Sequence, residues 1–192
     1  MDIQKQLEDL HLENQLSAEN IPDLDLYMDQ VIQLFESKFA SSKRYEEDKV
    51  LTKTMINNYA KAKLFFPIKN KKYSKEHLLI ISMIYQMKSV LSMKDIGKTF
   101  EGINHRIQED ELDLENFYNN YIQLMDRNVV RFKEYIKEQE EIVEKELDTN
   151  VVNDTYLQQV LLITSLTGMS NFYRRAAEKL IDQLEMEGEK EQ

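Results

Sequence analysis

The 192-residue sequence contains no cysteine and no tryptophan, and only two prolines and four glycines. The absence of cysteine excludes disulfides and thiolate metal sites. So few helix-breaking residues, together with 31% charged residues, are typical of a mostly α-helical protein. The sequence has no apolar run of about 18 residues and no signal-peptide pattern, so we expect a cytoplasmic protein that does not span a membrane.

The sequence also has few residues of the types that carry out catalysis. The three histidines are isolated from one another: His11, His77 and His105. His77 falls in the first turn of an expected helix, where we expect it on the surface. A carboxylate metal site could be built from Glu140, Glu141 and Glu144, but the paired Glu-x-x-His motif of di-iron bundles is absent, and we interpret these residues as a solvated face. We expect no enzymatic activity, no cofactor and no metal.

Acidic residues are missing from one long segment of an otherwise acidic chain. The segment from Lys49 to Lys75 holds eight lysines and no aspartate or glutamate, a charge of +8 in a chain of net charge −10, so the remainder sums to −18. Positive charge concentrated in this way is typical of a surface that binds a polyanion. The alternative is a lysine-rich solvated face without a ligand.

Helix signals flank the centre of this basic segment. Thr52 can cap a helix whose apolar side carries Met55, Ile56 and Tyr59. Phe65-Phe66-Pro67 then stops the helix, because the residue before a proline disfavours helical angles. Lys69-Asn70-Lys71-Lys72 forms a basic, hairpin-like turn closed by Tyr73, and Ser74 caps a second helix that runs to Val90.

The order of these residues resembles the DNA-binding domain of MerR-type regulators. The matching positions are Thr52, Tyr59, Leu64, Pro67, Lys71-x-Tyr73-Ser74, Leu78, Ile84 and Leu91-Ser92-Met93-x-Asp95-Ile96. The resemblance implies a winged helix-turn-helix with a small β wing. Thr54 and Asn57 stand where that pattern usually has arginines, and Lys63 replaces the glycine that ends the recognition helix, so Lys63 is expected in a left-handed conformation.

A longer span, residues 26–96, is similar to the bacterial domain-of-unknown-function 1836 family. The similarity is carried by Tyr-Met-Asp-Gln-Val at residues 27–31 and by Leu-Thr-Lys-Thr-Met-Ile-Asn-Asn-Tyr at residues 51–59. The label of that family is silent on function, so this similarity implies a fold and no activity.

The candidate DNA contacts lie on the first helix of the basic segment and on the turn. Lysines and short polar side chains suit phosphate and base-edge contacts. We expect the phosphate contacts to be Lys53, Tyr59, Lys61, Lys69, Lys71 and Lys72, and the base contacts to be Thr54, Asn57 and Asn58. Tyr59 is also a candidate for the core.

The remaining segments complete the domain organisation. Residues 1–24 form an acidic arm, either a frayed helix or a shield over the basic segment, and Asp25 caps a helix from Leu26 to Phe39. The DNA-binding domain spans residues 25–101 and ends after a short helix that Ser92 caps and that runs to Phe100. Periodicity lapses from Gly102, the expected domain boundary. A tail at residues 187–192 is expected to be disordered.

Two long helices are expected at residues 112–186, one from Asp113 and one from Val152 to Met186. Their apolar stripes are too extensive for the pair alone, so we predict that this domain makes a homodimer. Gly168 either breaks the second helix or, as we favour, allows close helix approach. Aromatic residues on the first helix either line an effector pocket or, as we favour, pack in the core: Phe117, Tyr118, Tyr121, Phe132 and Tyr135.

The sequence thus predicts a mostly α-helical transcriptional regulator that binds double-stranded DNA as a homodimer. Two recognition helices would enter successive major grooves of a palindromic operator, and the lysines of the turn would hold flanking phosphates. The alternative is a non-catalytic protein-interaction module, in which the same scaffold binds an acidic protein. The sequence does not identify an effector, the operator, or whether the regulator represses or activates.

Overall fold

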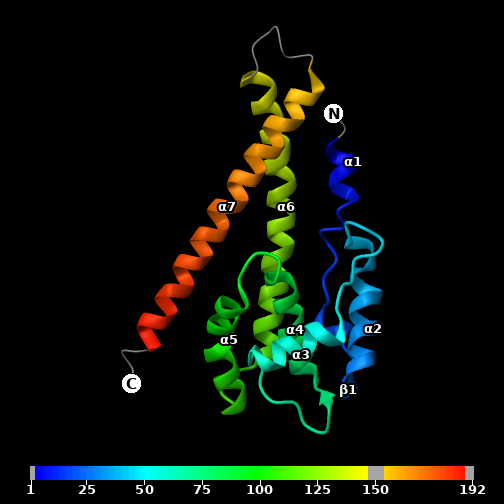
Figure 1. Ribbon diagram of the computed structural model, residues 1–192, viewed down its shortest axis with the longest axis vertical. Coiled ribbons are helices and arrows are strands. Elements are labelled where there is room, and N and C mark those ends of the chain that lie inside the picture. Colours follow the sequence, from blue (N-terminus) through cyan, green and yellow to red (C-terminus); the bar gives the residue numbers. More distant parts are fainter. Residues whose placement is uncertain (1–2, 147–153, 189–192) are drawn as a thin grey trace.

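The computed structural model describes residues 3–146 and 154–188, and it is mostly helical (Figure 1). The helices are α1 (Ile3–Glu8), α2 (Met28–Phe39), α3 (Lys53–Lys61), α4 (Lys75–Met87), α5 (Met93–Gln108), α6 (Leu114–Glu146) and α7 (Thr155–Gly188). Two 3-10 turns, Ala18–Asn20 and Ala40–Ser42, and two short strands, β1 (Leu26–Tyr27) and β2 (Lys72–Tyr73), complete the described elements. None of the described helices is long and apolar enough to cross a membrane.

Helix α4 is the centre of the main hydrophobic core. Every residue from His77 to Ile84 is buried, which is the pattern of a helix covered on all sides. Helices α2, α3 and α5 surround it, with buried Phe35, Ile56 and Phe100 turned toward the core. The same core includes Leu114 and Tyr118 from the first turns of α6. The first helix of the expected dimerisation segment is therefore joined to the N-terminal helices by packing.

The two strands connect the start of α2 to the segment that follows α3. They are antiparallel, with Leu26 opposite Tyr73 and Tyr27 opposite Lys72. The prediction that Asp25 caps a helix from Leu26 is wrong, because residues 26 and 27 are in this sheet and α2 begins at Met28. The backbone N–H of Tyr27 donates to Oε1 of Gln30 at 2.8 Å, which satisfies an amide that would otherwise be free at the helix start.

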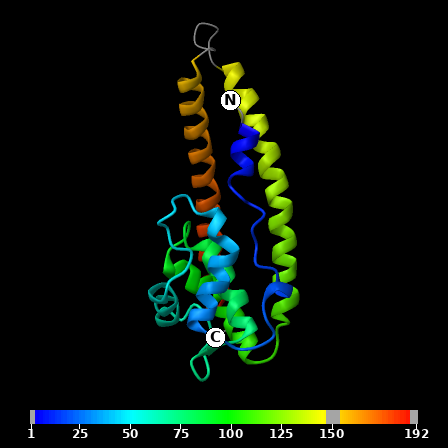
Figure 2. The same ribbon diagram turned by 90° about the vertical axis from the view of Figure 1, so that its right-hand side faces the viewer.

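The N-terminal segment is packed against the body of the protein, contrary to the expectation of a frayed helix or a shield over the basic segment. Leu16, Ala18 and Ile21 are buried in the main core. The segment runs along α6, where Glu13 forms an ion pair with Lys133, and the Gln15 side chain donates to Asp126 at 3.0 Å (Figure 2). The expectation rested on the many acidic side chains of residues 1–24. The few apolar residues that anchor the segment do not recur at a regular helical spacing, so the sequence pattern does not predict their burial.

Helix α5 is longer than the sequence predicts. Ser92 begins it as expected, accepting a hydrogen bond from the backbone N–H of Asp95 at 3.1 Å, but the helix continues past Phe100 and Gly102 to Gln108. Buried Asn104 lies in this extension and donates to the carbonyl oxygen of Leu64 at 3.1 Å. This tertiary contact stabilises the extension. The regular spacing of apolar residues ends near Gly102, so the sequence pattern alone does not predict that the helix continues.

Helices α6 and α7 form a long hairpin whose upper part extends beyond the body (Figures 1 and 2). A second, smaller core joins them to α1 through Leu7, Ile136, Val143 and Leu162. Helix α7 is continuous through Gly168, and a Cβ atom placed there would meet nothing within 4 Å, so the favoured close approach is wrong within this chain. Thr149-Asn150, where the sequence predicts the turn between the two long helices, lies outside the described residues. Helix α7 extends into the predicted disordered tail as far as Gly188.

Candidate nucleic-acid interface

Helix α3 presents one apolar and one polar face. Its start is fixed by Thr52, whose Oγ1 accepts a hydrogen bond from the backbone N–H of Met55 at 3.1 Å, as predicted. Ile56 is fully buried and anchors the helix on α4 and α2. The opposite face is exposed and carries five of the predicted contact residues: Lys53, Thr54, Asn57, Asn58 and Lys61. This face of α3 is thus exposed to solvent, with one contact to α2 through the ion pair of Lys53 with Asp29.

Tyr59 belongs to the core and is not on this face. Only 3% of its surface is exposed, and its hydroxyl has no hydrogen-bond partner among the described residues. Burial raises the pKa of the Tyr59 hydroxyl to about 12. Of the two roles that the sequence allows for Tyr59, the structure favours packing, and we remove it from the candidate contacts.

The segment after α3 is held by its backbone. Lys63 has φ of 54°, the left-handed conformation expected of the residue that replaces a glycine. Its backbone N–H donates to the carbonyl oxygen of Ala60, and that of Leu64 donates to Tyr59, which closes the last turn. Leu64 and Phe65 are then buried against the core. These contacts fix the direction in which the chain leaves α3.

His77 holds both ends of the connection between α3 and α4. The prediction of a surface histidine is wrong, because only 4% of its surface is exposed. Nδ1 accepts a hydrogen bond from the backbone N–H of Ser74 at 3.1 Å, so the neutral ring carries its proton on Nε2, which donates to the carbonyl oxygen of Phe66 at 3.2 Å. Burial lowers the pKa of His77 below its ordinary value of 6.5.

Between these anchors the chain makes a tight basic turn, the hairpin-like turn that the sequence predicts. Lys69 and Lys72 form an antiparallel bridge, and the backbone N–H of Lys72 donates to the carbonyl oxygen of Lys69 at 2.9 Å. Asn70 and Lys71 have φ of 52° and 59°, the pair of left-handed residues that defines a type I′ turn. Lys69 and Lys71 are exposed, while Lys72 is half-buried with Nζ 5.1 Å from the centre of the Tyr27 ring.

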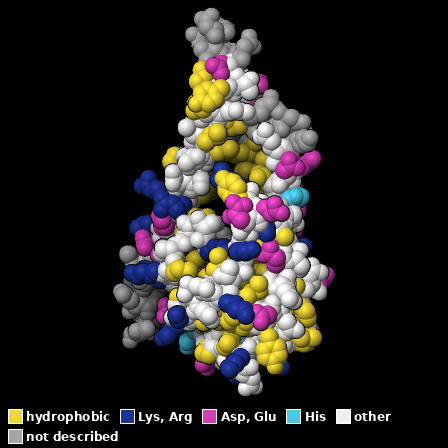
Figure 3. Space-filling model, turned by 45° about the vertical axis from the view of Figure 1, so that its right-hand side comes forward, with side chains coloured by type: hydrophobic (Ala, Val, Ile, Leu, Met, Phe, Trp, Pro, Cys, Tyr) yellow, Lys and Arg dark blue, Asp and Glu magenta, His cyan; other side chains and the backbone are white. Residues whose placement is uncertain are grey.

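The electrostatic surroundings separate the lysines of the basic segment into two groups. Nζ of Lys53 lies 2.8 Å from Oδ1 of Asp29 in α2, and Nζ of Lys75 lies 2.7 Å from Oε2 of Glu115 in α6. Lys61, Lys69 and Lys71 are exposed and form no ion pair with the described residues. Figure 3 shows Lys and Arg side chains scattered over the middle and lower parts of one face of the molecule, with Asp and Glu side chains among them. Charge is therefore available on the end of α3 and on the turn.

Sequence reasoning missed two parts of this surface. Tyr27 supports Lys72 across the β1–β2 pair, and two-residue strands leave no period by which they could be predicted. The sequence pattern marks Lys63 as the end of a helix, but its side chain is also exposed, beside Lys61 and Ala62. Lys63 is one of the eight lysines between Lys49 and Lys75, and this clustering is the sequence feature that identifies it as a further candidate phosphate contact.

A family model described as "Domain of unknown function (DUF1836)" matches residues 16–121. No curated protein and no solved structure matches the chain. The matched span has nearly the same limits as the main core, which begins at Leu16 and ends at Tyr118. The match supports the DUF1836 part of the resemblance seen in the sequence and gives no support to its MerR part. Because the match covers more than half of the 192-residue chain, the chain belongs to the DUF1836 family.

Proposed function

We propose that the protein is a transcriptional regulator that binds double-stranded DNA through α3 and the adjacent basic turn. The observation that carries the proposal is the exposed face of α3, where lysines and short polar side chains face solvent inside a segment without acidic residues. Thr54, Asn57 and Asn58 have the length and the hydrogen-bonding groups to reach base edges, and Lys61 can reach a phosphate. Lys53 joins them when it leaves Asp29, because an exposed ion pair of this kind is weak.

The arrangement around α3 supports a winged helix-turn-helix of the MerR type. Helices α2 and α3 are followed by a two-residue basic turn, and its strand β2 pairs with β1 at the start of α2. The pairing ties the turn to the same body that carries α3. Lys69, Lys71 and Lys72 then act as the wing that holds phosphates beside the groove that α3 enters. The connection between α2 and α3, which includes the 3-10 turn Ala40–Ser42, is longer than the compact turns of such motifs.

We further propose that a homodimer forms through the long C-terminal helices. Leu162 and Ile181 are the buried apolar residues of the described part of α7. Leu166 and Met169 are half-buried, and nine further large apolar side chains of α7 are exposed to solvent in one chain: Tyr156, Leu157, Val160, Leu161, Ile163, Phe172, Tyr173, Leu180 and Leu184. Exposed apolar surface on this scale marks an interaction site. Two-fold symmetry would then present two α3 helices to two half-sites about 34 Å apart on one side of the duplex.

A gel-shift titration with the upstream region of the protein's own gene, with and without competitor DNA, tests the proposal. We expect a shifted band that survives an excess of unrelated duplex. A shift that competitor removes completely indicates phosphate binding without sequence readout. No shift at low salt contradicts DNA binding and favours the alternative, a module that binds an acidic protein through the same lysines.

A further inference from the structure

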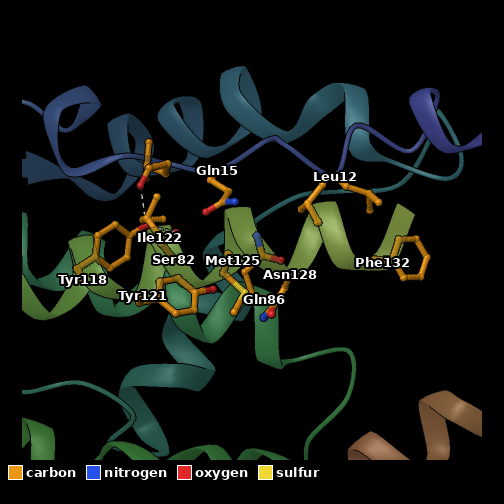
Figure 4. Close-up of a pocket in the computed structure, with 12 residues that line it drawn as sticks. Leu12, Gln15, Ser82, Gln86, Tyr118, Tyr121, Ile122, Met125, Asn128 and Phe132 are labelled. Carbon is orange, nitrogen blue, oxygen red and sulfur yellow. Dashed lines mark hydrogen bonds between the residues drawn. The ribbon is translucent and has the colours of Figure 1, made fainter. Parts of the chain in front are cut away.

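A pocket lies between the N-terminal segment, α4 and α6, away from α3 and the turn. Its volume is 240 Å³, and its walls include Leu12 and Gln15 from the N-terminal segment, Ser82 from α4, and Tyr121, Met125 and Phe132 from α6 (Figure 4). For comparison, a buried apolar cavity of about 150 Å³ in another protein holds one benzene molecule. The pocket is therefore large enough for one aromatic ring with a substituent.

The lining of this pocket is neutral. None of the residues that line it is an aspartate, glutamate, lysine, arginine or histidine. Burial raises the pKa of the Tyr121 hydroxyl to about 12, so this group also stays uncharged at neutral pH. A charged ligand would lose its hydration without gaining a counter-charge, which is costly. The pocket thus favours an uncharged molecule.

One polar atom in the lining lacks a partner. The Gln15 side-chain NH₂ donates to Oδ1 of Asp126 at 3.0 Å, and because a carboxylate can only accept, this bond fixes the orientation of the amide. The Gln15 carbonyl oxygen is then directed away from Asp126; it is buried and accepts no hydrogen bond from the described residues. A buried acceptor without a donor costs free energy, which a ligand with an N–H or O–H group would recover.

The other polar atoms at the closed end are already satisfied. The Tyr118 hydroxyl lies 2.6 Å from the carbonyl oxygen of Leu16 and 2.9 Å from Oγ of Ser82 (Figure 4). These bonds fix the floor of the pocket and join the N-terminal segment to α4 and α6. At the other end of the pocket, Phe132 exposes 36% of its surface. Gln86 and Asn128 also line the pocket but are exposed, so the Gln15 carbonyl oxygen is the buried acceptor of the lining that gains most from a donor on the ligand.

We propose that this pocket is a binding site for a small, uncharged aromatic molecule with one hydrogen-bond donor, such as a phenol, which donates to the Gln15 carbonyl oxygen while its ring lies against Met125 and Phe132. Binding would tie the N-terminal segment more firmly to α6, since Leu12 and Gln15 form one wall. The proposal is independent of DNA binding, because the pocket shares no residue with α3 or the turn.

Ligand-observed NMR titration of the full chain with phenol, toluene and benzoate tests the site. Phenol and toluene have nearly the same shape, but only phenol has a hydrogen-bond donor, its O–H group. Benzoate carries a negative charge. We expect phenol to bind about 3- to 10-fold more tightly than toluene, the effect of one neutral hydrogen bond, and benzoate not to bind. Equal dissociation constants for phenol and toluene, or binding of benzoate, would overturn the proposal.

Three variants locate the binding. Gln15→Met keeps the length of the side chain without the acceptor, so the phenol-to-toluene ratio should fall to about one, whereas Gln123→Met, an exposed position on α6 outside the pocket, should leave it unchanged. Met125→Trp should fill the space and abolish binding of both compounds. Phenol should also slow amide hydrogen exchange at residues 12–16 in wild type. An unchanged ratio in Gln15→Met, or unchanged exchange with phenol bound, contradicts the assignment.

Discussion

At the scale of single residues, His77 is the side chain whose protonation has the clearest consequence. Both ring nitrogens are used in the neutral form, one accepting from Ser74 and one donating to Phe66. A second proton on the ring would remove the acceptor and place a largely buried charge beside the rings of Phe65 and Phe66. The neutral imidazole is therefore the form that the fold selects.

Stability should fall as the pH is lowered below about 6.5, the value for an exposed histidine. Because the pKa of His77 is lowered in the folded state, the unfolded chain takes up the proton first, so the loss begins near pH 6.5 and ends below the folded pKa. Urea unfolding between pH 7.5 and pH 5 measures it. His77→Gln should remove this dependence, while His105→Gln, at an exposed position, should retain it; equal slopes in both variants contradict the assignment.

Lys63 offers a second residue-scale prediction. A left-handed lysine costs roughly 1 kcal/mol that glycine avoids, so Lys63→Gly should raise the free energy of unfolding by up to about 1 kcal/mol. Ala60→Gly is the matched control at an exposed position in the last turn of α3, where glycine should lower stability by about 1 kcal/mol. Chemical unfolding of both variants checks this. Equal destabilisation by the two substitutions would mean that Lys63 is not strained.

Sequence reasoning worked at residues whose role depends on near neighbours. The Thr52 cap and the left-handed Lys63 follow from a helix start and a helix end, both readable in a short window. His77 and Tyr59 could not be placed in this way. The burial of His77 depends on Phe66, eleven positions away, and that of Tyr59 on packing against several helices.

At the scale of elements, the long helices and the basic turn were predictable and the small sheet was not. Apolar residues that recur at helical spacing over many positions identify α4, α6 and α7. The polar run Lys69-Asn70-Lys71-Lys72 identifies the turn. Strands β1 and β2 have two residues each, and their pairing spans the whole of α2 and α3. Such pairing depends on tertiary contacts, which override local propensity.

Charge reversal of the turn tests its proposed role as a wing. Lys71→Glu with Lys72→Glu should weaken binding to every duplex sequence by a similar factor, and should reduce the slope of log K against log salt by about two, since each phosphate contact contributes about 0.9. Fluorescence anisotropy across a salt series gives both quantities. Lys137→Glu with Lys145→Glu makes the same change of charge on exposed positions of α6 and should leave the slope as in wild type. An equal slope for both double variants excludes the turn from the interface.

At the scale of the whole molecule, the structure has one well-packed body and a hairpin with uncovered apolar side chains. The body coincides with the family match, residues 16–121, and contains the candidate interface. Helix α7 lies outside that match and is 34 residues long, with most of its large apolar side chains exposed. This division supports one role for the body and a separate one, assembly, for the hairpin.

Added charge on α7 should dissociate the proposed dimer. Phe172→Glu with Leu180→Glu places two carboxylates at positions that are more than 60% exposed in one chain, so the monomer should fold while the interface is lost. Sedimentation equilibrium should give the mass of two chains for wild type and of one chain for this variant. Asn171→Glu with Gln183→Glu adds the same charge at neighbouring polar positions and should remain dimeric at micromolar concentration. A monomeric wild type contradicts the dimer.

The most direct test of the central proposal is to recover and sequence the DNA that is crosslinked to the protein in cells. The account predicts a limited set of enriched sites that share an inverted repeat with half-sites about 10 base pairs apart, and their loss when Thr54, Asn57 and Asn58 are replaced by alanine. Recovered DNA that matches the input across the whole genome, for wild type and variant alike, would contradict it.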